Sequence, residues 1–196
     1  TNIVLMGMGE PLDNYDATVD AVRLMILPEA LKLSSRKVTL STAGQVDLIK
    51  KFQEEDLPVN LAISLNATDN KTRQDIMPIN KKYPIEVLME CLRNYPLKPS
   101  RRLTFEYVML GGINDRDEDA RRLAKLLHGI PNKVNLIPFN KFALSEFDPP
   151  DEEQVLSFQQ YLLAKNYTVF IRRNRATDIL GACGQLAAQP LSPAPA

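Results

Sequence analysis

The feature of this sequence that most constrains its fold is a regular alternation of two kinds of segment. Short apolar runs rich in β-branched residues predict strands near residues 2–6, 37–41, 60–64, 103–108, 133–137 and 167–171. Between them, apolar residues at helical spacing predict helices near residues 16–27, 45–54, 85–95, 117–127 and 151–166. Because such alternation is typical of parallel strands joined by right-handed crossovers, we predict an α/β fold, either a barrel or a doubly wound sheet.

Length and composition indicate the number of domains and the cellular compartment. A chain of 196 residues that is 44% hydrophobic can bury one sizeable core. We expect one domain over residues 1–188 and a disordered Pro/Ala/Ser tail over residues 189–196. Basic and acidic residues number 24 each, so any RNA site must be a local patch. The two cysteines and the absence of a long uncharged apolar run favour a cytoplasmic protein without a membrane partner.

Polar residues follow several of the predicted strands at the point where each strand ends. These residues are Gly9 and Glu10, Ser41, Ser64 and Asn66, and Asn140. In parallel α/β barrels the carboxyl ends of the strands form one rim that carries the ligand sites, so we expect these side chains to converge. Any one of them could equally be a helix cap or a turn former, but this explanation is weaker for all of them together.

The segment after the first predicted strand admits two interpretations. Residues 7–12 begin like a dinucleotide-binding fingerprint, but Leu12 stands where the third glycine would be, so we reject that interpretation. A strand that ends in Gly-Glu-Pro lets the backbone approach a ligand, and the carboxylate of Glu10 could hold an ammonium group. Equally, Glu10 could lie near the positive end of the next helix. The residues alone favour neither.

Cys183 follows the last predicted strand and has small neighbours, which would leave its sulfur accessible. A nucleophile or covalent carrier requires a lowered thiol pKa, and Arg172, Arg173 and Arg175, which are near in sequence, could supply the positive charge for it. Free cysteines are more often small buried residues, and local sequence favours that alternative.

The remaining cysteine and the one histidine have ordinary structural explanations. Cys91 lies in an amphipathic segment and is predicted to fill the core. His128, followed by Gly129, has the pattern of a helix C-terminus. Because no Cys/His cluster has metal-ligand spacing, we expect no metal site within this chain.

Seven strings of the sequence together resemble the RlmN/Cfr-type radical-SAM methyl synthases, in order and at the expected spacing. They are residues 6–12, 38–42, 61–65, 77–83, 106–110, 135–140 and 182–186. The resemblance implies a partial, open TIM-type β/α barrel of the radical-SAM kind, with parallel strands, outer helices and the first strand or strands missing.

The same resemblance implies an enzyme that methylates C2 of an adenine in 23S rRNA, and of an adenine in tRNA. The cofactors would be S-adenosyl-L-methionine and a [4Fe–4S] cluster, with a flavodoxin-type protein as electron donor. Cys183 would carry the methyl group, and a radical generated from a second S-adenosylmethionine would activate that group for addition to C2. The residues implied to bind S-adenosylmethionine are Gly9, Glu10, Ser41, Ser64, Leu65, Asn66 and Asn140.

The sequence departs from the family pattern in two ways. The CxxxCxxC motif, whose three thiolates would hold the cluster, is expected before Thr1 and is absent. We therefore expect this polypeptide alone to be inert, and its strand at residues 2–6 to expose an unpaired edge that promotes dimerisation or aggregation. Asn66 and Ala176 stand where the family usually has His and Gly, and Asn66 keeps a side-chain hydrogen bond but not the imidazole.

Two other interpretations stay open. The chain could belong to another radical-SAM enzyme that acts on a small molecule. It could also be a non-catalytic partial barrel that binds RNA or a protein through its arginines, among them Arg101 and Arg102.

Overall fold

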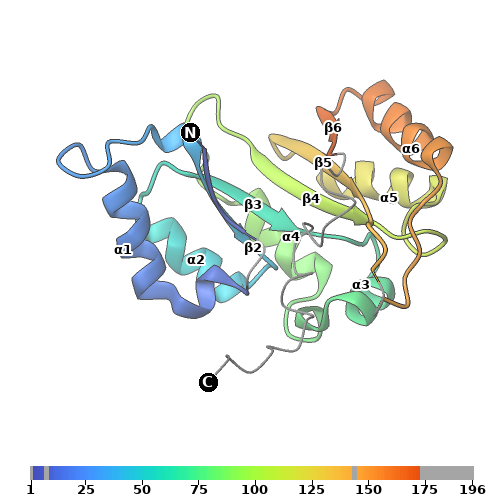
Figure 1. Cartoon of the computed structure of the whole chain (residues 1–196), viewed down its shortest axis with the longest axis horizontal. Helices are drawn as coiled ribbons and strands as arrows, with labels where there is room; N and C mark the ends of the chain where they lie inside the picture. The colour runs from blue at the N-terminus through green and yellow to red at the C-terminus, as the bar shows by residue number, and fades with distance from the viewer. Residues whose placement is uncertain (1, 7–8, 143–144, 173–196) are drawn as a thin grey trace, which may run out of the picture.

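The computed structural model describes residues 2–6, 9–142 and 145–172 and contains one six-stranded parallel sheet (Figure 1). Neighbouring strands follow one another in sequence order. The strands are β1 (Ile3–Leu5), β2 (Val38–Thr42), β3 (Asn60–Ser64), β4 (Leu103–Met109), β5 (Asn132–Pro138) and β6 (Val169–Ile171). Because every crossover moves on by one strand in the same direction, right-handed connections place the helices on one face, as in a barrel and not in a doubly wound sheet. The sheet stays open, with β1 and β6 at its edges.

The elements agree closely with the sequence prediction. All six strands and all five predicted helices are present, each within two residues of the predicted bounds. The helices are α1 (Tyr15–Ile26), α2 (Val46–Glu54), α4 (Ile85–Arg93), α5 (Asp117–Leu127) and α6 (Glu152–Ala164). The prediction missed the short elements η1 (Pro11–Asn14), η2 (Ser35–Lys37), α3 (Asn70–Ile76) and η3 (Pro78–Lys81), which are too short to show a helical apolar period.

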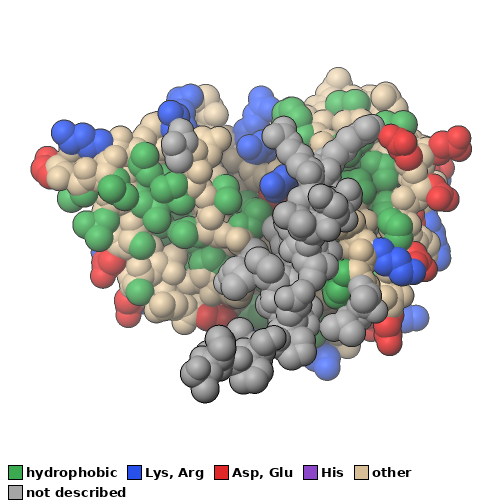
Figure 2. Space-filling view, in the orientation of Figure 1, with side chains coloured by type: hydrophobic (Ala, Val, Ile, Leu, Met, Phe, Trp, Pro, Cys, Tyr) green, Lys and Arg blue, Asp and Glu red, His purple; other side chains and the backbone are tan. Residues whose placement is uncertain are grey.

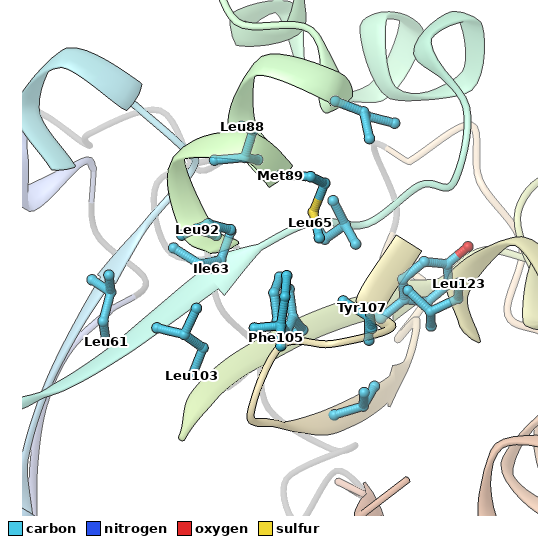
Figure 3. Close-up of a cluster of buried hydrophobic side chains, with 14 of the residues drawn as sticks. Leu61, Ile63, Leu65, Leu88, Met89, Leu92, Leu103, Phe105, Tyr107 and Leu123 are labelled. Atoms are coloured by element: carbon cyan, nitrogen blue, oxygen red, sulfur yellow. The ribbon is translucent and has the colours of Figure 1, made fainter. Parts of the chain in front are cut away.

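The hydrophobic core lies between the outer face of the sheet and the helices. Alternate residues of β3 and β4, such as Ile63, Phe105 and Tyr107, point toward α4 and α5 and are fully buried (Figure 3). Cys91 of α4 is buried in the same core, which confirms its predicted role. Because strand side chains alternate between faces, the residues between these apolar positions point to the opposite, concave face.

The concave face is polar at the carboxyl ends of the strands. Ser41, Ser64 and Glu106 occupy its positions on β2, β3 and β4. The apolar core thus lies on the convex, helix-covered face of the sheet, and polar groups lie on the concave face, where a ligand can bind.

Two further predictions concern the C-terminus of helix α5 and the last residues of the chain. Helix α5 ends at Leu127, His128 is its C-cap, and Gly129 has φ +80°, which confirms the predicted helix terminus. Residues 173–196, which include Arg173, Arg175, Ala176, Cys183 and the predicted tail, lie outside the described residues. In the part that is described, no helix is long and apolar enough to cross a membrane.

Candidate functional site

A cavity of about 380 Å³ opens on the concave face at the carboxyl ends of the strands, within the size range of small-molecule sites. It is lined by Met6, Gly9, Glu10, Pro11, Ser41, Thr42, Ala43, Ser64, Asn66, Glu106, Val108 and Ile137. The rim predicted from the sequence therefore brings together Gly9, Glu10, Ser41, Ser64 and Asn66.

Glu10 is held at this cavity by two backbone N–H groups. Gly9 has φ +74°, a conformation that favours glycine, and it turns the chain after β1. Glu10 then caps η1: its Oε1 accepts a hydrogen bond from Leu12 N at 3.1 Å, and its Oε2 accepts one from Ala43 N at 2.6 Å. Both interpretations of the sequence are thus compatible, because the carboxylate caps a short helix and lines the cavity.

Asn66 lines the cavity, but its side chain is already engaged by protein groups. Its φ of +56° is one that asparagine tolerates better than most residues. Its Oδ1 accepts a hydrogen bond from Val108 N at 2.9 Å, and its Nδ2 lies 3.2 Å from the sulfur of Met77. The amide therefore ties the end of β3 to β4, a role that the sequence did not indicate.

The structure does not bring two of the expected residues into the cavity lining. Leu65 is fully buried, and its side chain belongs to the core between sheet and helices (Figure 3). Asn140 lies two residues beyond β5, whose contribution to the lining is Ile137. Cys183, the expected methyl carrier, lies outside the described residues.

Glu106 is a cavity residue that the sequence analysis did not select. It lies in β4 and is only 5% exposed. Its Oε1 accepts a hydrogen bond from Asn135 Nδ2 at 2.9 Å, whereas its Oε2 has no hydrogen-bond partner among the described residues. Arg172 Nη1 lies 3.7 Å from Oε2, which is an ion pair but too long for a hydrogen bond.

A signal for Glu106 was present in the sequence. A glutamate in a strand that otherwise reads Leu-Thr-Phe and Tyr-Val-Met is unusual, because buried carboxylates are rare unless paired or used. A buried acceptor left without a donor is costly, so the free oxygen favours a ligand that supplies a donor.

The hydrogen-bond acceptors and charges of the cavity define the ligand chemistry that fits it. Two carboxylates, Glu10 and Glu106, suit a ligand with a positive charge and with N–H or O–H donors. Met6, Val108 and Ile137 add an apolar surface for a flat ring. Among the described residues, no group of three or more His, Cys, Asp and Glu could hold a metal ion.

Comparison with known protein families gives a match to the radical SAM superfamily over residues 1–124. Two curated relatives bear the name dual-specificity RNA methyltransferase RlmN. The protein from Syntrophobacter fumaroxidans is 50% identical over 189 residues, which is 96% of this chain and 55% of the relative. The protein from Anaeromyxobacter sp. is 50% identical over 200 residues, covering 100% of this chain and 53% of the relative. The chain thus spans about half the length of these relatives.

Solved structures agree with this family. A radical SAM methyltransferase from Sphaerobacter thermophilus superimposes with a TM-score of 0.89 at 42% identity, covering 94% of this chain and 54% of that one. A domain of pyruvate-formate lyase-activating enzyme from Bacteroides vulgatus gives a TM-score of 0.63 at 16% identity, covering 88% of this chain and 99% of that domain, which is a likeness of fold alone.

Proposed function

This chain belongs to the radical SAM superfamily, and on that premise we propose that it is part of an enzyme that methylates C2 of an adenine in 23S rRNA and in tRNA. The observation that carries the proposal is the cavity at the strand ends, where Glu10 and the unsatisfied oxygen of Glu106 suit a cationic ligand rich in donors. The relatives named as RNA methyltransferases support the choice of RNA as substrate.

S-adenosylmethionine fits the acceptor groups of the cavity, and together with a [4Fe–4S] cluster it would supply the radical chemistry that an unreactive C–H position needs. Glu10 would accept hydrogen bonds from its ammonium group, and the hydroxyls of Ser41 and Ser64 would bind its polar groups. Glu106 Oε2 would accept a further donor from the same ligand.

The other expected cofactor residues have different proposed roles. Gly9 would allow close approach of the backbone to the ligand. Asn66 would act through its backbone N–H, because its side chain is engaged by Val108 and Met77 and its carbonyl oxygen accepts from Asn114 Nδ2. Leu65 would support the end of β3 from the core, and Asn140 would reach the ligand from the segment after β5.

Cys183 is the proposed methyl carrier. Its thiol would lose a proton, and its sulfur would form a bond to the methyl carbon of S-adenosylmethionine as the bond from that carbon to the sulfonium breaks and S-adenosylhomocysteine leaves. A flavodoxin-type protein is the proposed electron donor, and a chain with only two, widely spaced cysteines fits a cytoplasmic setting.

The cofactor proposal is tested by the binding of S-adenosylmethionine to the 196-residue chain, measured by equilibrium dialysis. Glu10→Gln should weaken binding by about tenfold or more, because a charge-assisted hydrogen bond to the ammonium group is lost. Glu29→Gln removes the same charge from an exposed residue and should leave the affinity unchanged. Equal affinities of both variants and the unchanged chain would contradict the role of Glu10.

The reaction is tested in the complete gene product after anaerobic reconstitution of its cluster. Cys183→Ala should abolish methyl transfer to a 23S rRNA fragment and to tRNA, measured by mass spectrometry of digested nucleosides. Cys91→Ala is the matched control, because it removes a thiol of α4 that lies in the hydrophobic core, and methyl transfer should be retained. Retained transfer in Cys183→Ala would remove that residue from the mechanism.

The same assay separates the alternatives. Methylation of a small molecule but of neither RNA would favour another radical-SAM activity. On the face drawn in Figure 2, the Lys and Arg side chains of the described residues lie in small separate groups. One arginine considered for RNA binding, Arg101, donates to Asn60, Ser35 and Pro58, so it has a structural role.

A further inference from the structure

Arg73 in α3 is a fully buried cation whose hydrogen-bond partners are all neutral. Its Nε donates to Leu65 O at 3.1 Å and its Nη2 to Ala43 O at 2.7 Å. Its Nη1 donates to Asn80 Oδ1 at 3.1 Å and to Tyr83 O at 3.4 Å. Within the part of the chain that the structure describes, no carboxylate forms an ion pair with it.

The burial of the Arg73 charge carries a desolvation cost. Burial lowers the pKa of the Arg73 guanidinium to about 10, so it stays charged at neutral pH. A buried charge without a counter-charge is costly, whereas an apolar side chain of similar volume would avoid that cost but leave the acceptors of Ala43, Leu65 and Asn80 without this donor. The guanidinium offers instead a planar fork of donors that can hold several carbonyls in fixed relative positions.

Two of the carbonyls that Arg73 holds belong to the segments that follow β2 and β3. Ala43 comes directly after β2, and Leu65 directly after β3. Ala43 is also the residue whose N–H donates to Glu10 Oε2 at 2.6 Å. Hydrogen bonds therefore link the guanidinium of Arg73, through Ala43, to the carboxylate of Glu10 in the cavity.

Gly44 shows how closely this arrangement is packed. It has φ +103°, and a Cβ on it would lie 3.2 Å from Arg73 Nη2 and 3.0 Å from Leu88 Cδ2. A glycine at this position lets the backbone turn after Ala43 and lets the guanidinium approach it.

We propose that Arg73 is a positioning residue for the cavity: by fixing the carbonyls of Ala43 and Leu65, it directs the Ala43 N–H at Glu10 and holds the two strand ends around one ligand. The identity of that ligand as S-adenosylmethionine rests on the proposed function. The positioning itself depends only on contacts within this chain.

The first test needs no ligand. Amide hydrogen exchange of Ala43, compared with that of Leu40 in the preceding strand β2, is measured by NMR in the 196-residue chain. In Arg73→Met the Ala43 amide should exchange at least about tenfold faster relative to Leu40, because its hydrogen bond to Glu10 is loosened. Glu10→Gln should have a similar effect, and the double variant should add little to either single change.

Leu127→Ala is the matched control, because it removes a buried side chain from α5 in a part of the core away from the cavity. Even if Leu127→Ala lowers the thermal midpoint as much as Arg73→Met does, the ratio of the Ala43 exchange rate to the Leu40 exchange rate should stay unchanged. An unchanged ratio in Arg73→Met, or the same change in Leu127→Ala, would overturn the proposal.

Arg73→Lys keeps the charge but not the fork, which guards against a methionine variant that fails to fold. It should show the same selective change at Ala43, and a wild-type ratio in this variant would also count against the proposal. The second test is the affinity for S-adenosylmethionine, which should fall in Arg73→Lys by about tenfold and stay constant in Leu127→Ala. An unmodified chain that does not bind S-adenosylmethionine would overturn the proposed cofactor, whereas the amide measurement decides the role of Arg73.

Discussion

At the scale of single residues, Glu106 combines deep burial with an unsatisfied oxygen. Glu106→Gln keeps the shape of the side chain and removes its charge, so we predict that the affinity for S-adenosylmethionine falls by about tenfold. The thermal midpoint of the free chain should change little, because removal of the buried charge offsets the loss of the ion pair with the exposed Arg172. Equilibrium dialysis and thermal unfolding measure the two effects, with Glu29→Gln as the control for charge. An unchanged affinity would show that the free oxygen does not face the ligand.

Asp69 gives a prediction about pH. It caps α3, with Thr72 N donating to Oδ1 at 2.8 Å and Thr72 Oγ1 to Oδ2 at 2.9 Å. Burial opposes its ionisation, but the hydrogen bonds from Thr72 and the charge of Arg122 hold its pKa below the usual 3.8. A carboxyl whose pKa is lower in the folded state stabilises the protein above its unfolded pKa and loses that effect as pH falls through the folded pKa.

Asp69→Asn should therefore be less stable than the unchanged chain at pH 7, and the difference should shrink as the pH falls below about 4. Asp69→Ala also removes the cap and should lose about 1 kcal/mol more. Urea unfolding at a series of pH values measures both. A difference between the unchanged chain and Asp69→Asn that is constant from pH 7 to pH 3 would be inconsistent with this account.

At the scale of elements, the segment after β5 packs back on the loop after β4. Gly111 N donates to Asp148 O at 2.9 Å. The rings of Phe139 and Phe147 pack edge to face, with their centroids 6.2 Å apart. A Cβ on Gly111 would lie 2.6 Å from Pro149 O, a backbone atom that cannot rotate away. The segment can therefore pack in its place only if residue 111 lacks a side chain.

We predict that Gly111→Ala displaces residues 145–150 and costs about 1–3 kcal/mol of stability. Limited proteolysis should then cut this segment faster. The control is Gly129→Ala, which meets no atom within 4 Å but has an unfavourable φ of +80°. It should destabilise by about 1 kcal/mol without exposing the segment, and equal cleavage of both variants would argue against local displacement.

At the scale of the whole molecule, the open sheet leaves two edges. Strand β1 pairs with β2 alone among the described strands, and Val4 in it is 56% exposed. We predict that the 196-residue chain self-associates through this edge, because an unpaired apolar strand is a template for another strand. Light scattering should show a mass that rises with concentration, and Val4→Lys should suppress the rise. Phe170→Lys, on the opposite edge, tests whether β6 contributes. A wild-type chain that stays monomeric would contradict the prediction.

The sequence by itself determined the strands, the longer helices, the parallel sheet and most of the rim, because apolar periodicity and the residues that end a strand are local signals. Tertiary structure decided the rest. Glu10 meets Ala43 across 33 positions of sequence and Glu106 meets Asn135 across 29, and these contacts depend on how strands pair and curve. The burial of Arg73 among carbonyls likewise follows from how the loops fold around it. A residue type shows that a side chain can bind or pair, but only the packed sheet decides which group it meets.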